Sequence, residues 1–331
     1  LKLILLFTLN TIIIIFIIFK ILNPLNIIKA LFIIIPILVA VAYFTLLERK
    51  ILSYSQNRKG PNTVGIYGLL QPLADGLKLF TNEATLPSYS HMNTYILAPC
   101  LALFIALIIW AVIPFDSGVA IWDSNLGILY ILAVSSINVY ALLMAGWTSK
   151  SKYAFVGALR AVAQMISYEV SIGLIVLSVC IIASTLNLSI IVESQAYVWY
   201  LIPLWPVAIM LWVSLLAETN RTPFDLTEGE SELVSGYNVE YSSMAFALFF
   251  LAEYSNIILN SIIFTILFLG GWGPIGPLYL VLKSSIIMIA FIWIRATLPR
   301  MRYDNLMLLL WKSYLPLSIA YLILTTSILK C

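Results

Sequence analysis

The chain alternates long apolar runs with short islands of charge, and this pattern limits what it can fold into. The runs are near 20 residues long, which at about 1.5 Å per helical residue matches a bilayer core of about 30 Å. Alternating ten-residue segments typical of membrane β-strands are absent, so the spanning elements must be helices. Hydrophobic residues make up 62% of the sequence, well above the hydrophobic fraction of soluble domains. We therefore expect an all-α, polytopic membrane helix bundle.

Eight apolar runs are predicted to span the membrane, and a ninth precedes them. The eight are residues 27–47, 94–115, 126–147, 162–186, 199–217, 243–269, 277–298 and 306–329. The run at 3–19 has no small-residue cleavage site after it, which favours an extra N-terminal hydrophobic helix over a removed targeting peptide. We divide the chain into an N-terminal segment, 1–22, and a single membrane domain, 23–331.

The basic residues predict an orientation. If the eight helices alternate across the membrane, the loops 48–93, 148–161, 218–242 and 295–312 share one side. These loops carry thirteen of the 18 basic residues: Arg49, Lys50, Arg58, Lys59, Lys78, Lys150, Lys152, Arg160, Arg221, Arg295, Arg300, Arg302 and Lys312. By the positive-inside rule, that side is cytoplasmic or, in an organelle, the matrix.

The chain has few cysteine and histidine residues, which limits the metal sites that it can form. Three cysteines and one histidine cannot build a four-cysteine iron–sulfur cluster or a bis-histidine haem, so we expect no metal centre. The sequence from Gly271 to Gly276 satisfies G-x-G-x-x-G, but no strand precedes it and Pro274 removes a backbone donor that a pyrophosphate would need. It is predicted to be a tight loop, and we expect neither nucleotide nor nucleic acid to bind.

Residues 218–240 hold six of the chain's 15 carboxylates and one arginine, flush against apolar helices on both sides. Placing this much charge at a bilayer boundary costs free energy, so we expect the carboxylates to have a role there. Thr222 followed by Pro223 and Asp225 has the pattern of a helix start, so some carboxylates are explained by capping. Capping cannot account for all six, and the excess favours bound cations or shared protons.

Three glutamates in or beside apolar runs are predicted to be buried carboxyl groups that exchange protons. Glu169 and Glu253 lie inside apolar runs and Glu218 at the end of another, where an unneeded carboxyl costs roughly 2.5–3.5 kcal/mol. Close carboxylates in a low dielectric cannot all ionise, so the group is interpreted as a proton relay.

Near Glu169, a polar stripe lies along one helix face and is alternatively explained by helix–helix hydrogen bonding. Its members are Arg160, Gln164, Ser167, Tyr168 and Ser171.

The loop between the first two predicted spans combines cations with glycine and proline. Residues 66–80 alternate apolar and polar positions at helical spacing, which predicts a short helix along the membrane surface. An ordinary cationic loop reaching lipid headgroups is the alternative. We favour a shaped cavity wall, because glycine and proline fix a backbone shape that headgroup attraction does not require.

With these segments laid out, the chain resembles subunit 1 of the proton-pumping NADH:ubiquinone oxidoreductase, respiratory complex I, in its mitochondrial form. The match runs from about Ile27 to Trp311. It rests on strings such as Arg58-Lys-Gly-Pro-Asn62, Gln164-Met-Ile-Ser-Tyr-Glu169, Ala217-Glu-Thr-Asn-Arg-Thr-Pro-Phe-Asp-Leu226 and Pro299-Arg-Met-Arg-Tyr-Asp304.

The resemblance implies roles for residues already singled out. A quinone tunnel or its entrance would be lined by Arg49, Arg58, Asp75, Phe246, Phe250 and Arg295. A proton relay would comprise Glu169, Glu218, Asp225, Glu228, Glu230, Glu232, Glu240 and Glu253, with Arg160, Arg221 and Arg300 supporting the loops.

The resemblance also implies a setting. The chain would lie in the mitochondrial inner membrane with its basic loops on the matrix side, among lipid, hydrophilic quinone-site subunits and membrane-arm subunits. Ubiquinone would be the substrate, flavin and iron–sulfur clusters would belong to partner subunits, and this chain would not be catalytic alone.

Two other functions are compatible with a bundle of helices and carboxylates. A membrane subunit of an energy-converting hydrogenase-type complex would serve a partner without quinone, and a cationic loop such as 48–78 argues against it. A stand-alone proton-coupled transporter would show internal repeats with paired broken helices, and no such repeat is found.

Overall fold

The computed structural model describes residues 24–226, 236–274 and 276–330. Within them the chain is helical, and seven helical stretches are long and apolar enough to cross a membrane. The long helices are α2 (Pro24–Ser55), α4 (Met92–Ile108), α5 (Gly127–Thr148), α6 (Lys152–Ala183), α10 (Ser243–Phe268) and α11 (Pro277–Thr297). The seventh stretch joins α12 (Tyr303–Leu308), a π-helical segment (Leu309–Tyr314) and α13 (Leu315–Lys330). The prediction of an all-α membrane bundle is confirmed.

Shorter helices complete the described chain. They are the 3₁₀ turn Ile66–Gly68 and α3 (Gln71–Thr81), a 3₁₀ turn at Ile109–Val112, α7 (Leu188–Ser194), α8 (Trp205–Glu218) and the 3₁₀ turn Gly236–Asn238. The predicted surface helix between residues 66 and 80 is therefore present, in two pieces. The predicted N-terminal helix, in segment 1–22, lies outside the described residues.

Several boundaries differ from the sequence predictions, and α2, which continues to Ser55, is one of them. The span expected at 199–217 begins only at Trp205, because Pro203 and Pro206 lack the N–H groups that a longer helix would need. The predicted loop 148–161 was wrong: α6 begins at Lys152, capped by the Ser151 hydroxyl, which accepts a hydrogen bond from the Ala154 N–H at 3.3 Å. Residues 221–226 form turns rather than the helix expected after Thr222.

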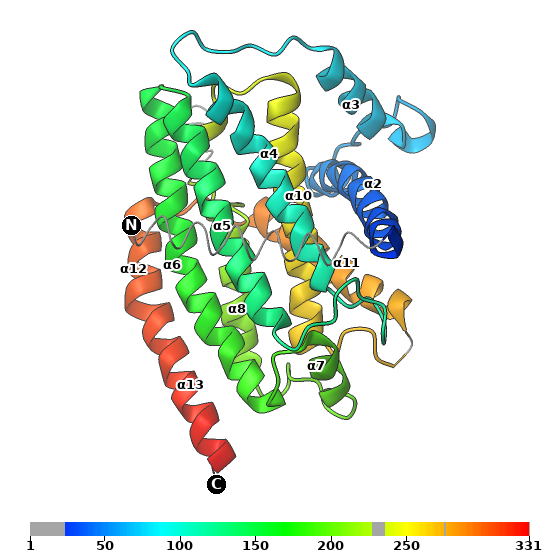
Figure 1. Ribbon diagram of the computed structural model, residues 1–331, viewed down its shortest axis with the longest axis vertical. Helices are drawn as coiled ribbons and strands as arrows, with labels where there is room; N and C mark the ends of the chain where they lie inside the picture. Colours follow the sequence, from blue (N-terminus) through cyan, green and yellow to red (C-terminus); the bar gives the residue numbers. More distant parts are fainter. Residues whose placement is uncertain (1–23, 227–235, 275, 331) are drawn as a thin grey trace.

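Long helices that follow one another in sequence also pack together. In Figure 1, α4, α5 and α6 stand side by side, with α13 along the outer side of α6. Helix α8 packs against α6, and α10 against α4, α11 and α2. Gly146 lets α5 and α6 approach closely, because a Cβ there would lie 2.2 Å from the Ala158 side chain. Four helices, α5, α6, α8 and α10, thus surround the middle of the bundle.

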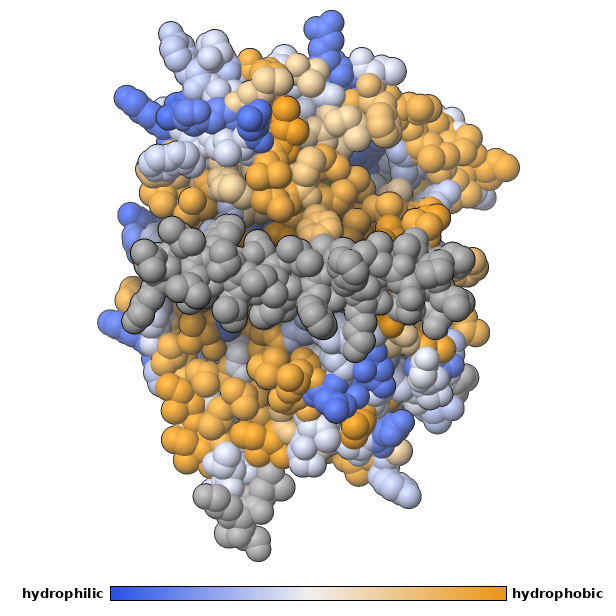
Figure 2. Space-filling view, viewed as in Figure 1, coloured by the Kyte–Doolittle hydropathy of each residue, from blue (hydrophilic) through white to orange (hydrophobic). Residues whose placement is uncertain are grey.

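The outer surface is strongly apolar. Figure 2 shows apolar side chains in broad patches over the visible face, with hydrophilic side chains in smaller groups. Among the exposed hydrophobics are Phe32 at 80%, Leu278 at 75% and Trp293 at 63% of full exposure. These helices therefore present the surface that a multi-pass protein turns to lipid or to other membrane chains.

The glycine-rich stretch after α10 is a loop, as the sequence predicted. The buried Lys283 ammonium donates to the backbone carbonyls of Leu269, Gly271 and Gly273 at 2.5, 3.2 and 3.3 Å. It also lies 4.0 Å from the centre of the Tyr279 ring. Lys283 thus holds this turn in place, and the stretch has a structural explanation that needs no nucleotide.

Candidate functional site

A buried charged cluster lies where α2, α11 and the loop after α8 meet. Glu48 on α2 is 4% exposed. It accepts hydrogen bonds from Arg221 Nη1 at 2.9 Å, from Tyr254 Oη at 2.6 Å and from Arg295. One carboxylate is therefore shared by two guanidinium groups from distant segments.

Electrostatics keeps Arg221 of this cluster charged. Burial alone lowers the pKa of Arg221, but the neighbouring carboxylates, led by Glu48, outweigh burial and raise it above its ordinary value. The guanidinium also lies 4.6 Å from the Tyr254 ring centre. Arg221 therefore stays protonated beside Glu48 at any physiological pH, and the pair behaves as a fixed ionic tie between α2 and the loop.

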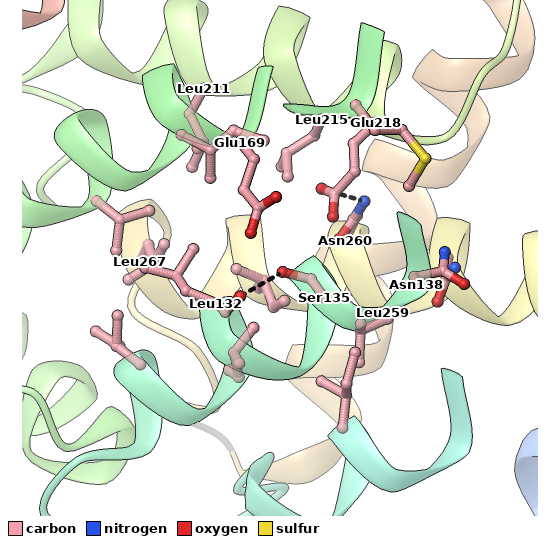
Figure 3. Close-up of a pocket in the computed structure, with 18 of the residues that line it drawn as sticks. Leu132, Ser135, Asn138, Glu169, Leu211, Leu215, Glu218, Leu259, Asn260 and Leu267 are labelled. Carbon is pink, nitrogen blue, oxygen red and sulfur yellow. Dashed lines mark hydrogen bonds between the residues drawn. The ribbon is translucent and has the colours of Figure 1, made fainter. Parts of the chain in front are cut away.

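The middle of the bundle encloses a cavity of about 60 Å³ that two carboxyl groups share. Glu169 on α6 and Glu218 at the end of α8 both point into it, as Figure 3 shows. Asn260 on α10 donates a hydrogen bond to Glu218 Oε2 at 3.1 Å. The remaining polar lining comes from α5 and α10, and leucine and isoleucine form most of the rest. The structure therefore brings Glu169 and Glu218, two residues of the predicted relay, to the same cavity.

A second cavity, about 20 Å³, holds the third intramembrane carboxyl. Glu253 on α10 lines it together with Glu218, and Glu253 Oε1 accepts a hydrogen bond from Tyr237 Oη at 2.6 Å. A third cavity of about 10 Å³ is lined by Glu48, Arg221 and Arg295, and it shares Thr219 with the second. Carboxyl groups therefore follow one another from the Glu48 cluster to Glu169.

The predicted tunnel residues fall into two settings. Arg49 on α2 and Asp75 on α3 form an ion pair at 2.7 Å with side chains 53% and 38% exposed, and Arg58 is exposed in the loop between them. Phe246 and Phe250 lie one turn apart on α10, with ring centres 4.4 Å apart and ring planes tilted by 45°. None of these five lines the three cavities, whereas the sixth predicted residue, Arg295, belongs to the Glu48 cluster.

The other predicted relay residues are placed less uniformly. Asp225 is buried and pairs with Arg300 Nη2 at 3.2 Å. Glu240 is half-buried just before α10, outside the three cavities, and its backbone carbonyl accepts a hydrogen bond from Tyr95. Three predicted members lie outside the described residues: Glu228, Glu230 and Glu232.

The polar stripe on α6 holds neighbouring segments together. Gln164 is fully buried, and its Nε2 donates to the carbonyls of Ala217 and Phe224, both at 2.9 Å. Ser167 accepts a hydrogen bond from Trp311 Nε1 at 3.3 Å. Arg160 lies at 5.9 Å from the Tyr303 ring centre. Hydrogen bonds between segments therefore explain Gln164 and Ser167 of this stripe, and Gln164 fixes the end of α8 beside Glu218.

Comparison with known proteins places the chain in a family. A family model described as NADH dehydrogenase matches residues 28–326. The sea anemone Metridium senile has a protein, named NADH-ubiquinone oxidoreductase chain 1, that is 63% identical over 310 residues, 92% of this chain and 93% of its own length. The chain belongs to the NADH dehydrogenase family. The family resemblance seen in the sequence is thereby confirmed.

Relatives in this NADH dehydrogenase family span bacteria and animals. An NADH-quinone oxidoreductase subunit of Paramagnetospirillum magneticum is 54% identical over 306 residues, 90% of each chain. The goldfish Carassius auratus has an NADH-ubiquinone oxidoreductase chain 1 that is 53% identical over 308 residues, 92% of this chain and 94% of the relative. The family match therefore covers nearly the whole described bundle.

Sequence reasoning missed several residues of this candidate site. Glu48 was assigned to a loop, because the charged Glu48-Arg-Lys string ends the apolar run, although α2 continues to Ser55. Asn260 and Asn256 gave no charge signal, yet they follow Glu253 at helical spacing, which places all three on one face of α10.

Among the described residues, no group of three histidine, cysteine or acidic side chains is arranged to hold a metal ion.

Proposed function

We propose that this chain is the membrane subunit of an NADH:ubiquinone oxidoreductase that forms the ubiquinone tunnel and couples quinone reduction to proton translocation. The names of its relatives support the enzyme complex. The succession of carboxyl-lined cavities, from the Glu48 cluster through Glu253 and Glu218 to Glu169, is the observation that carries the coupling role. Such a succession has no use in a protein that only anchors other subunits.

The tunnel assignment rests on the α2–α3 arm, defined as residues 49–82. Its ion pair, Arg49 with Asp75, is exposed, and apolar side chains on the same arm, such as Leu73 at 60% and Phe80 at 69%, face outward. An arm with both an apolar face and a fixed polar pair suits a long-tailed quinone with a polar headgroup. Partner subunits would close the open side and hold the quinone site, the flavin and the iron–sulfur clusters.

The proposed relay works by protonation rather than by electron transfer. Reduction of the quinone takes up protons near the Glu48 cluster, and the field change shifts the protonation of Glu253, Glu218 and Glu169 in turn. Arg221, fixed in its charged form, provides a constant positive charge beside Glu48 and Glu253. The chain would lie in the mitochondrial inner membrane, with the α2–α3 arm on the matrix side.

Two experiments test this assignment. Isolated from native membranes by an affinity tag, the chain should co-purify with an assembly that contains flavin and iron–sulfur absorption and that reduces ubiquinone from NADH. The same chain expressed and folded alone should oxidise no NADH and bind no flavin. A chain that runs alone in native gels, or one that keeps a cofactor through stringent purification, would contradict the proposal.

A further inference from the structure

The two larger cavities meet at a wall built from all four surrounding helices. Asn138 of α5, Met165 of α6, Glu218 of α8 and Asn256 of α10 line both of them. Two asparagine amides therefore lie beside Glu218 at the junction, with Glu169 on one side and Glu253 on the other. The chain's charge pattern gives no sign of this arrangement, because amides are neutral.

Helix α10 carries a polar line across this junction. Glu253, Asn256 and Asn260 are spaced by three and four residues, so they follow one face of the helix. The two ends of the line are hydrogen-bonded: Glu253 accepts from Tyr237, and Asn260 donates to Glu218. Asn256, between them, makes no side-chain hydrogen bond to any residue that the structure describes.

Asn256 is partly buried, and it contributes to the lining of both cavities. A polar cavity of at least about 10–15 Å³ can hold a water molecule. The cavities on either side measure about 60 and 20 Å³, so each exceeds the volume that one water molecule needs. Water on both sides of Asn256 would satisfy its amide group.

We propose that Asn256 is a positioning residue that holds water between Glu218 and Glu253, and that Asn260 fixes the Glu218 carboxyl toward it. This inference rests on the proposed relay function. In each transfer the protonated carboxyl gives its proton to the bridging water while that water gives another proton to the second carboxylate. One O–H bond breaks and one forms at each oxygen pair, the water ends neutral, and the amide gains and loses nothing.

Two substitutions separate positioning from packing. Asn256→Leu keeps the branched shape of the side chain but removes every donor and acceptor, whereas Asn256→Ser keeps a hydroxyl and leaves more room for water. In the assembled complex, Asn256→Leu should lower ubiquinone-linked NADH oxidation and proton pumping about tenfold and enlarge the solvent deuterium isotope effect. Asn256→Ser should keep at least half of both. Electron transfer from NADH to a soluble acceptor should stay unchanged in both variants.

Ser136→Leu is the matched control. Ser136 lies on α5 outside the three cavities, and within the described residues its hydroxyl bonds only to the Ala133 carbonyl of its own helix. This change should leave turnover, pumping and the isotope effect as in the unmodified complex. An Asn256→Leu complex within twofold of the unmodified one would overturn the inference, and so would equal losses in Asn256→Leu and Asn256→Ser.

Two further measurements keep the inference distinct from the proposed function. If Glu218→Gln and Glu253→Gln leave coupled turnover intact, the relay itself fails; if they abolish it while Asn256→Leu does not, only the positioning role fails. Should Asn256→Leu not assemble, a high-resolution experimental structure of the unmodified complex decides. Water oxygen density within hydrogen-bond distance of the Asn256 amide and Glu218 is expected, and a dry junction would refute the proposal.

Discussion

The Glu48 cluster and the α2–α3 arm carry the same kinds of charged side chain in opposite settings. Glu48 is nearly inaccessible and has three partners, whereas Arg49, the next residue along α2, is half-exposed in a single pair with Asp75. Charge in the interior is held by a complete set of partners, so removing one member leaves the others uncompensated. Charge on the arm is open to solvent and remains available to a ligand or a partner chain.

The largest effect should come from breaking the interior set. Glu48→Leu would leave Arg221 and Arg295 without their shared carboxylate, which in comparable buried pairs costs about 3–5 kcal/mol. We expect little assembled complex on native gels at 37 °C. Asp75→Leu removes the equivalent partner on the arm and should assemble normally. Comparable assembly of the two variants would remove the contrast between the regions.

The next effect concerns the shape of the arm. Gly68 has φ of +76°, and a Cβ there would lie 2.3 Å from the Pro61 carbonyl oxygen. Gly68→Ala should therefore distort the loop, with about 1–2 kcal/mol from the left-handed backbone alone, and lower ubiquinone-linked turnover severalfold. Gly76→Ala is the control, because a Cβ at Gly76 meets nothing within 4 Å and alanine favours helix α3. Similar activity in both variants would show that the loop shape is not required.

Arg295→Lys should have a smaller and more selective effect. Lysine keeps the positive charge beside Glu48 but lacks the planar fork of arginine, and Arg221 still holds the carboxylate. Quinone reduction should fall severalfold while NADH oxidation with a soluble acceptor stays unchanged. Parallel loss of both activities would indicate failed assembly instead of a local defect at the tunnel.

The smallest effect on stability should follow from Asp75→Asn. Exposed ion pairs contribute at most about 1 kcal/mol, so the yield of complex and its resistance to heat should match those of the unmodified protein. If Asp75 lines the quinone tunnel, the apparent KM for a short-chain ubiquinone should nevertheless rise. Reduced assembly with an unaltered KM would assign Asp75 to the fold alone.

Most helices could be predicted from the sequence because bilayer thickness imposes their length. The spans predicted at 126–147, 243–269 and 277–298 lie within one residue of α5, α10 and α11. Prediction failed where a helix continues past the apolar region. From hydropathy alone, the first span is predicted to end before Glu48 and another to begin after Arg160. Hydrogen bonding and small-residue packing extend α2 and α6 past those charges.

Three carboxyl groups of the candidate site could be predicted from the sequence, whereas Glu48 and the amides could not. Glu169, Glu218 and Glu253 were found because ionisable groups are conspicuous in apolar runs. Asn138, Asn256 and Asn260 carry no charge, and polar residues in membrane helices are often only helix contacts. Which of them face a cavity depends on how α5, α8 and α10 rotate against α6, which depends on contacts between helices far apart in the sequence.

Proton translocation by the Glu218→Gln complex tests the central claim most directly. Gln has nearly the shape of Glu and can still interact with Asn260, so the cavities should persist while the ionisable group is lost. In sealed membrane vesicles, ubiquinone-linked NADH oxidation and proton pumping should fall together, with electron transfer to a soluble acceptor intact. Normal assembly with full turnover and full pumping at every pH tested would contradict the account and leave Glu218 as a helix-end charge.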